Sequence, residues 1–161
     1  MCVTSQLDFR VRDAVPAETA AIEALARRAF RTAAPEWAGH ADDEAPWARW
    51  VSRFFEAPLD GQFILVAEGV DRAIWGVAHV LQMIDPLAPG GHPHLETVAV
   101  AEFAEGRGVA SALIEASAQR ARELGGELFT LHVYPGNSRA QAVYERLGFD
   151  AEWLRMRRPL A

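Results

Sequence analysis

Apolar and polar positions alternate near the start of the chain and then change to a helical spacing. Leu7, Phe9 and Val11 alternate with polar residues, which predicts a half-buried strand over residues 7–14. After Pro16 the spacing predicts a helix, whose apolar positions are Ile22, Leu25, Ala26, Ala29 and Phe30. The same spacing predicts a second, aromatic-rich helix that ends near Pro58 and contains Trp47, Trp50, Val51, Phe54 and Phe55.

The rest of the chain predicts a sheet whose strands are interrupted by two further helices. Strands are expected over residues 62–69, 73–84, 94–101, 127–134 and 149–160, and the first two form an antiparallel hairpin. Residues 85–93 are expected to form a loop. Helices are predicted from Val109 to Leu124, before Gly125 and Gly126, and from Ser138 to Leu147. This order implies one α/β (α+β) domain over residues 1–161, with a mixed, mostly antiparallel central sheet flanked by helices.

Composition narrows the classes of function. The 161 residues carry a formal net charge of −6, and arginines are interspersed with acidic residues, which argues against a nucleic-acid-binding surface. No apolar run approaches the ~20 residues of a membrane span, and no signal peptide is evident, so we expect a cytoplasmic protein without a membrane partner. Cys2 is the only cysteine, which excludes an internal disulfide and a thiolate metal cluster.

The segment AEGRGVASALIEAS, residues 104–117, places two glycines directly before a predicted helix. A dinucleotide-binding turn would have a third glycine where Ser111 stands and would follow the first strand of the fold. A Walker phosphate-binding loop needs a lysine, which this region lacks. Two interpretations stay open from the residues alone. One is a tight turn without a ligand, and the other is an anion site at the unpaired N–H groups of the helix.

The segments ETVAVAEFAEGRGVASALIEAS and LFTLHVYPGNSRAQAVYERLGF together resemble the GCN5-related N-acetyltransferase (GNAT) superfamily. The family signature is Arg or Gln, two residues, Gly, one residue, then Gly or Ala, and it falls here on Glu105, Gly108 and Ala110. Later family residues follow at matching spacing, namely Asn137, Ala140, Tyr144 and Leu147 to Phe149. The resemblance implies the GNAT fold and direct transfer of an acetyl group from acetyl-CoA, the acyl donor, to a primary amine in a ternary complex.

The resemblance also implies which residues bind the coenzyme. The main-chain amides of the loop and of the helix start, over Glu105, Gly106, Arg107, Gly108, Val109 and Ala110, would hold the diphosphate. Asn137, before the next predicted helix, would also contact the coenzyme, and Arg107 and Arg139 would add positive charge. Val98, Ala99 and Val100 would line the thioester, and the Val100 N–H would donate to the developing oxyanion. Glu105 departs from the Arg or Gln of the family, and we expect its carboxylate to weaken the anion site somewhat.

Acetyl transfer needs a base for the ammonium, donors for the oxyanion and an acid for the leaving thiolate, because alkylamines and thiols have pKa values of about 10 and 8.5. The resemblance places Tyr144 near the coenzyme sulfur as the acid. Alternation along a regular strand puts His94 and Glu96 on the face of Val98 and Val100, so either is a candidate base, directly or through water. The alternative is that Glu96 only attracts cationic amines.

Other possibilities are weaker or stay open. His92, His94 and His132 lack the further ligands of a zinc site, so we expect no metal. An acyl-CoA-binding regulatory module without turnover and a stand-alone nucleotide-binding domain are alternative functions. No motif marks the acceptor pocket, so a small-molecule amine and a peptide or protein amine are both compatible. The oligomeric state is open, with a homodimer as one alternative.

Overall fold

The computed structural model describes residues 8–33, 50–85 and 88–158. Its five-stranded sheet has the order β1-β2-β3-β4-β5. The first four strands pair antiparallel, and β5 pairs parallel with β4. The strands are β1 (Phe9–Asp13), β2 (Phe63–Gly69), β3 (Ile74–Asp85), β4 (Ala88–Val100) and β5 (Thr130–Leu131). This arrangement confirms the predicted mixed, mostly antiparallel sheet.

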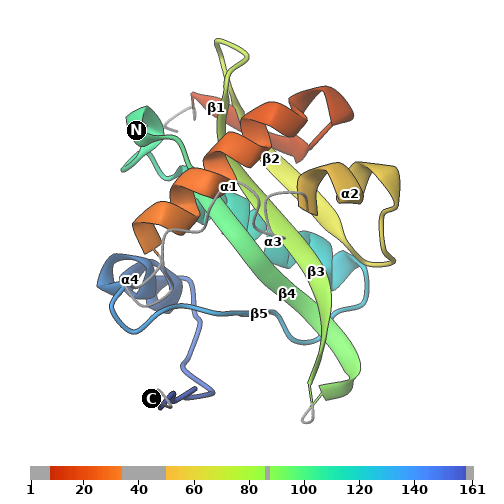
Figure 1. Cartoon of the computed structure of the whole chain (residues 1–161), viewed down its shortest axis with the longest axis vertical. Coiled ribbons are helices and arrows are strands. Elements are labelled where there is room, and N and C mark those ends of the chain that lie inside the picture. Colours follow the sequence, from red (N-terminus) through yellow and green to blue (C-terminus); the bar gives the residue numbers. More distant parts are fainter. Residues whose placement is uncertain (1–7, 34–49, 86–87, 159–161) are drawn as a thin grey trace, which may run out of the picture.

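Helices cover both faces of the sheet (Figure 1). α1 (Thr19–Ala33) and α2 (Trp50–Glu56) lie on one face, and α3 (Val109–Glu123) lies on the other. The last helix, α4 (Ser138–Arg146), follows β5. Two short 3-10 turns, η1 (Pro16–Glu18) and η4 (Glu102–Ala104), precede α1 and the glycine loop. None of the helices in the described ranges is long and apolar enough to cross a membrane.

Contacts from β3 identify the two faces. The ring of His79 stacks on Trp50 of α2, with 4.2 Å between centroids, so this face belongs to α1 and α2. A Cβ on Gly76 would lie 2.9 Å from Val109 and 3.0 Å from Leu113, so the other face belongs to α3. Because no side chain could fit at position 76, α3 packs directly on the main chain of β3.

The core lies between these helices and the central strands. Its fully buried apolar side chains come from both helical layers and from β2 and β3, and include Ile22, Val51, Ile64, Val66, Val77, Val80, Val109, Leu113 and Ile114. Each contributes about 1.5–3 kcal/mol by leaving water. The apolar periodicity of the helices therefore identifies the side that packs on the sheet.

The β3–β4 hairpin is longer than the sequence predicts. The expected loop over residues 85–93 belongs mostly to β4, which pairs with β3 as far as Asp85 and Ala88. The register shifts between Met83 and Asp85, so the pairing of this part is irregular. The prediction was wrong because glycine and proline indicate only a local preference, which pairing with a neighbouring strand overrides.

The C-terminal strands are shorter than predicted or absent. The strand expected over 127–134 is reduced to the two residues of β5, and no strand forms within described residues 149–158. Trp153, Leu154 and Met156 in that segment are 64%, 76% and 83% exposed. An apolar pattern becomes a strand only where another strand supplies hydrogen bonds, and none of the described strands pairs with this segment. Cys2, Leu7 and Trp47 lie outside the described residues.

Glu68 of β2 should make the free energy of unfolding depend on pH. Its side chain is 6% exposed and accepts hydrogen bonds from Arg12 Nε at 3.1 Å and Arg10 Nε at 2.7 Å. The bonds from Arg12 and then Arg10 lower the pKa of Glu68 from 4.5 to about 2. A depressed folded-state pKa stabilises the protein above pH 4.5, and this contribution disappears as the pH falls toward 2.

Glu68→Gln should therefore flatten the loss of unfolding free energy between about pH 4.5 and pH 2. Urea unfolding of both proteins across that range measures the slope. Parallel curves for the wild type and the variant would show that the Glu68 carboxylate contributes nothing to the acid sensitivity of the fold.

Candidate active site

β4 and β5 separate after two residue pairs, which opens a cleft beside the C-terminal half of β4. The parallel register joins His94 to Thr130 and Leu95 to Leu131 and extends no further. Within the described residues, no strand pairs with residues 96–100 on this side. A parallel pair that separates in this way exposes main-chain hydrogen-bonding groups along an inner strand, where a ligand can use them.

The peptide groups of Val98 and Val100 point into this opening. The N–H of Ala101 donates to the Trp75 carbonyl of β3 over 2.8 Å, and successive residues of a strand direct their peptide groups to opposite sides. Val98 and Val100 therefore direct theirs away from β3. Consistent with this direction, the Val100 carbonyl accepts a 3.0 Å hydrogen bond from Arg28 Nη1 of α1. The N–H groups of both valines are thus directed toward the cleft.

A β-bulge lies at Glu96. β4 pairs Leu95 with Val80 and Thr97 with His79, so two steps of β4 oppose one step of β3. Glu96 is the extra residue of the bulge and has no partner in the ladder. The bulge reverses which face of the sheet each following side chain occupies.

This reversal separates His94 from the two valines of the predicted site. His94 and Thr97 lie on the face covered by α1 and α2, whereas Val98 and Val100 lie on the face of α3. The prediction that His94, Glu96, Val98 and Val100 share one face is therefore wrong. Period-two alternation holds only in a regular strand, and the bulge at Glu96 interrupts it.

His94 is buried and is linked to β5 through Thr130. Its Nδ1 lies 2.7 Å from Thr130 Oγ1, and the same hydroxyl lies 2.8 Å from His92 Nε2. Thr130 has one hydroxyl proton, so it donates to one ring and accepts an N–H from the other. Burial, and to a smaller extent His132 and His92, lowers the pKa of His94 to about 4. The ring is therefore neutral near pH 7.

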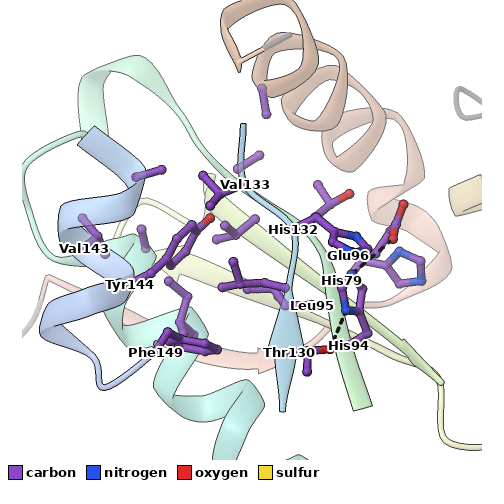
Figure 2. A pocket seen from close by; sticks show the side chains of 18 of the residues that line it. His79, His94, Leu95, Glu96, Thr130, His132, Val133, Val143, Tyr144 and Phe149 are labelled. Atoms are coloured by element: carbon purple, nitrogen blue, oxygen red, sulfur yellow. Dashed lines mark hydrogen bonds and ion pairs between the residues drawn. The ribbon is translucent and has the colours of Figure 1, made fainter. Parts of the chain in front are cut away.

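Glu96 is the accessible carboxylate beside these histidines. Its side chain is 49% exposed, and its Oε2 lies 3.9 Å from His94 Nε2. Figure 2 shows Glu96 grouped with His79, His94 and His132 on one side of the β5 chain. A cationic group that enters from solvent can meet Glu96 directly, whereas the His94 ring is 1% exposed.

The glycine loop leads into the N-terminus of α3. Gly106 and Gly108 have φ values of +74° and +80°, which L side chains rarely adopt, and a Cβ at either position would meet no atom within 4 Å. Gly108 is the N-cap of α3, and no side chain caps that end. The first N–H groups of a helix have no partner within it, and the helix dipole is positive there. The loop therefore offers an accessible site for an anion.

Glu105, at the start of this loop, is paired with two arginines. Its Oε1 lies 2.7 Å from Arg28 Nη2, and its Oε2 lies 2.7 Å from Arg139 Nη1. These bonds, that from Arg28 first, lower the pKa of Glu105. Arg107 behaves differently, because its guanidinium lies 5.4 Å from the Trp75 ring centroid and Arg107 does not line the cleft.

Tyr144 lies on α4, across β5 from the histidines. Asn137 caps this helix by accepting a 3.2 Å hydrogen bond from the Ala140 N–H, which sets where α4 begins. The Tyr144 ring packs 5.9 Å from Phe149, and burial raises the pKa of its hydroxyl. The hydroxyl therefore stays protonated at neutral pH. Figure 2 shows Tyr144 with Val143 and Phe149 on the side of β5 opposite to Glu96.

Most of the predicted site residues line one cleft. These are His94, Glu96, Val98, Ala99, Val100, Glu105, Gly106, Gly108, Val109, Ala110, Asn137, Arg139 and Tyr144. The cleft thus brings together the N-terminus of α3, exposed strand amides, a protonated tyrosine and an accessible carboxylate.

The model of the Acetyltransferase (GNAT) family matches residues 19–149, most of the chain. The chain belongs to the GNAT acetyltransferase family. A curated relative is the uncharacterized N-acetyltransferase YdgE of Bacillus subtilis (strain 168), which is 34% identical over 76 residues. That match covers 47% of this chain, and it spans about half (48%) of the relative's length.

Solved structures support the GNAT fold. A mutant of the BH1408 protein from Bacillus halodurans superimposes with a TM-score of 0.78 at 21% identity, covering 94% of this chain and 99% of the other. The aminoglycoside N-acetyltransferase AAC(6')-Iy with bound CoA gives a TM-score of 0.70 at 20% identity, covering 95% of both chains. Its complex with a bisubstrate analogue, CoA-S-monomethyl-acetylneamine, gives 0.72 at 22%, covering 95% and 99%. At these identities the likeness concerns the fold.

Sequence reasoning missed three residues of the GNAT cleft. His79 lies beneath Trp50 of α2, Thr130 links two histidines, and Arg28 reaches the end of β4 from α1. Arg28 lies 77 positions from Glu105 in the chain, and Thr130 lies 36 from His94. Contacts at such separations leave no signal in local periodicity. Only the polar character of His79 among the apolar neighbours Val77, Ala78 and Val80 could have indicated a special position.

Proposed function

We propose that this chain transfers an acetyl group from acetyl-CoA to a primary amine by direct transfer in a ternary complex. One observation carries the proposal. The N-terminus of α3 and the outward-facing amides of β4 line the same cleft, one able to hold a diphosphate and the other a thioester. The relative AAC(6')-Iy, solved with CoA and with a CoA-aminoglycoside analogue, supports an amine as acceptor.

In the proposed complex, the amides of the glycine loop bind the diphosphate of the coenzyme and the pantetheine follows the open edge of β4. The thioester lies beside Val98 and Val100, and the Val100 N–H donates to the oxyanion of the tetrahedral intermediate. Ala99 also lines the cleft, but its main-chain N–H and carbonyl face β3 and are not available to the thioester. Holding both substrates in one cleft removes the need for a covalent enzyme intermediate.

Two side chains move the protons in this proposal. Tyr144 donates to the thiolate of the leaving coenzyme, and its raised pKa means that the hydroxyl carries its proton at neutral pH. Glu96 accepts a proton from the acceptor ammonium, because it is the carboxylate that solvent and substrate can reach. Neutral His94 then orients Glu96 or a water molecule rather than acting as the base itself.

A panel of amines with detection of free CoA tests the proposed function. Polyamines, amino acids, aminoglycosides and peptides should be presented with acetyl-CoA at neutral pH. At least one amine should increase the release of CoA above the rate without acceptor. Tight binding of acetyl-CoA with no release for any amine would favour the regulatory module of the same fold instead.

Glu96→Gln should lower kcat about 10-fold or more below neutral pH, with recovery at higher pH as water removes the proton from the amine. His94→Gln should leave the shape of this pH profile unchanged, because the pKa of His94 is already about 4 in the folded protein. The measurement is kcat against pH for both variants with a good amine. A Glu96→Gln variant with a raised KM and a wild-type kcat profile would show that Glu96 only attracts cationic amines.

A further inference from the structure

We propose that Glu105 positions the diphosphate-binding loop and Arg139, so that this carboxylate strengthens coenzyme binding. The inference rests on the proposed function, in which the loop over residues 105–110 holds the diphosphate of CoA. It reverses the expectation from charge alone, by which an added carboxylate weakens an anion site. Glu105 would then be a positioning residue that acts through the groups it holds.

The two oxygens of Glu105 join the loop to two helices. Oε1 is 2.7 Å from Arg28 Nη2 of α1, and Oε2 is 2.7 Å from Arg139 Nη1 of α4. Two arginines and one carboxylate leave this cluster with a net charge of +1. The cluster is therefore still attractive to an anion, although the first loop position carries a negative side chain.

Arg28 extends the same connection to the end of β4. While Nη2 binds Glu105, Nη1 donates to the Val100 carbonyl over 3.0 Å. One planar guanidinium thus fixes the start of the glycine loop relative to the strand whose N–H groups face the cleft. The proposed diphosphate site and the proposed oxyanion donor share this anchor.

In this proposal, the ordering of the loop and of Arg139 affects coenzyme binding more than the negative charge of Glu105 does. Gly106 and Gly108 give the loop more conformational freedom than other residues would, and nothing lies within 4 Å of a Cβ at either position. Arg139 is 73% exposed, so without Glu105 its long side chain would sample many rotamers. When Glu105 orders the loop and the Arg139 side chain before the ligand binds, less conformational entropy is lost on binding. The repulsion between Glu105 and the ligand is reduced by its two partners and by salt.

Calorimetry with CoA as the probe tests this inference. Glu105→Gln should raise the Kd for CoA about 3- to 10-fold, the effect of releasing one or two ordered side chains. Glu102→Gln is the matched control, because it removes the same charge three residues earlier, from a side chain that does not line the cleft. It should leave the Kd unchanged or lower it slightly. CoA binding by Glu105→Gln at wild-type strength or tighter would overturn the inference.

Two further readouts separate positioning from a general structural effect. With acetyl-pantetheine, which has no diphosphate, the kcat/KM of Glu105→Gln should match the wild type, and an equal loss with this donor would overturn the inference. In an Arg139→Gln background, Glu105→Gln should weaken CoA binding less than in the wild type. Full additivity would show that Glu105 does not act through Arg139. Absence of CoA binding by the wild-type protein would instead contradict the proposed function.

Discussion

Gly108→Asp should raise the Kd for acetyl-CoA by at least about 100-fold and abolish the increase in melting temperature that the ligand gives to the wild type. The carboxylate would occupy the open space before α3, where it repels a diphosphate and blocks its approach to the helix amides. The variant would also lose hydrogen bonds to a charged ligand, each worth about 1.5–3 kcal/mol. Two lost bonds of this kind account for the expected change.

Gly125→Asp provides the matched control for this prediction. Gly125 lies at the opposite end of α3, its φ is +90°, and a Cβ there would also meet no atom within 4 Å. The control therefore adds the same strain and the same charge away from the cleft. We expect it to lower the melting temperature but to bind acetyl-CoA like the wild type. Wild-type binding by Gly108→Asp in calorimetry would place the coenzyme away from this loop.

Tyr144→Phe should lower kcat about 10- to 1000-fold and leave the Kd for acetyl-CoA almost unchanged, as expected when a general acid is removed. The ring would keep its packing against Phe149, because only the hydroxyl is lost. Burial raises the pKa of this hydroxyl, so the wild-type enzyme should keep its acid up to alkaline pH. Steady-state kinetics with a good amine, together with calorimetry, measures both quantities.

Tyr134→Phe removes the same atom from the other tyrosine of the chain, which also lines the cleft, and it should lower kcat far less than Tyr144→Phe. If Tyr144→Phe turns over as fast as this control, Tyr144 is a packing residue of α4. The thiolate of the coenzyme would then leave without assistance or take its proton from water.

The glycine loop and α3 were predictable because their signals are local. The apolar spacing after Val109 defines a helix, and the glycines before it can adopt the positive φ values that the turn requires. The helix ends before Gly125, where the sequence places its end. The loop and the helix could therefore be predicted from about 20 consecutive residues.

The faces of β4 were not predictable, because they depend on pairing with another strand. The bulge at Glu96 comes from the register with β3 and turns His94 away from the face of Val98. The triad of Arg28, Glu105 and Arg139 likewise joins three distant segments. No sequence pattern reports such contacts. The sequence therefore showed that Glu105 departs from the Arg or Gln of the family, but not that Arg28 and Arg139 bind it.

The most direct test of the central claim measures free CoA and acetylated amine in the same reaction, with the wild-type protein and its best acceptor. Acetyl transfer from acetyl-CoA to the amine in this cleft predicts equal molar amounts of the two products and the loss of both in Gly108→Asp. CoA released without acetylated amine, or product formation unaffected by Gly108→Asp, would contradict it.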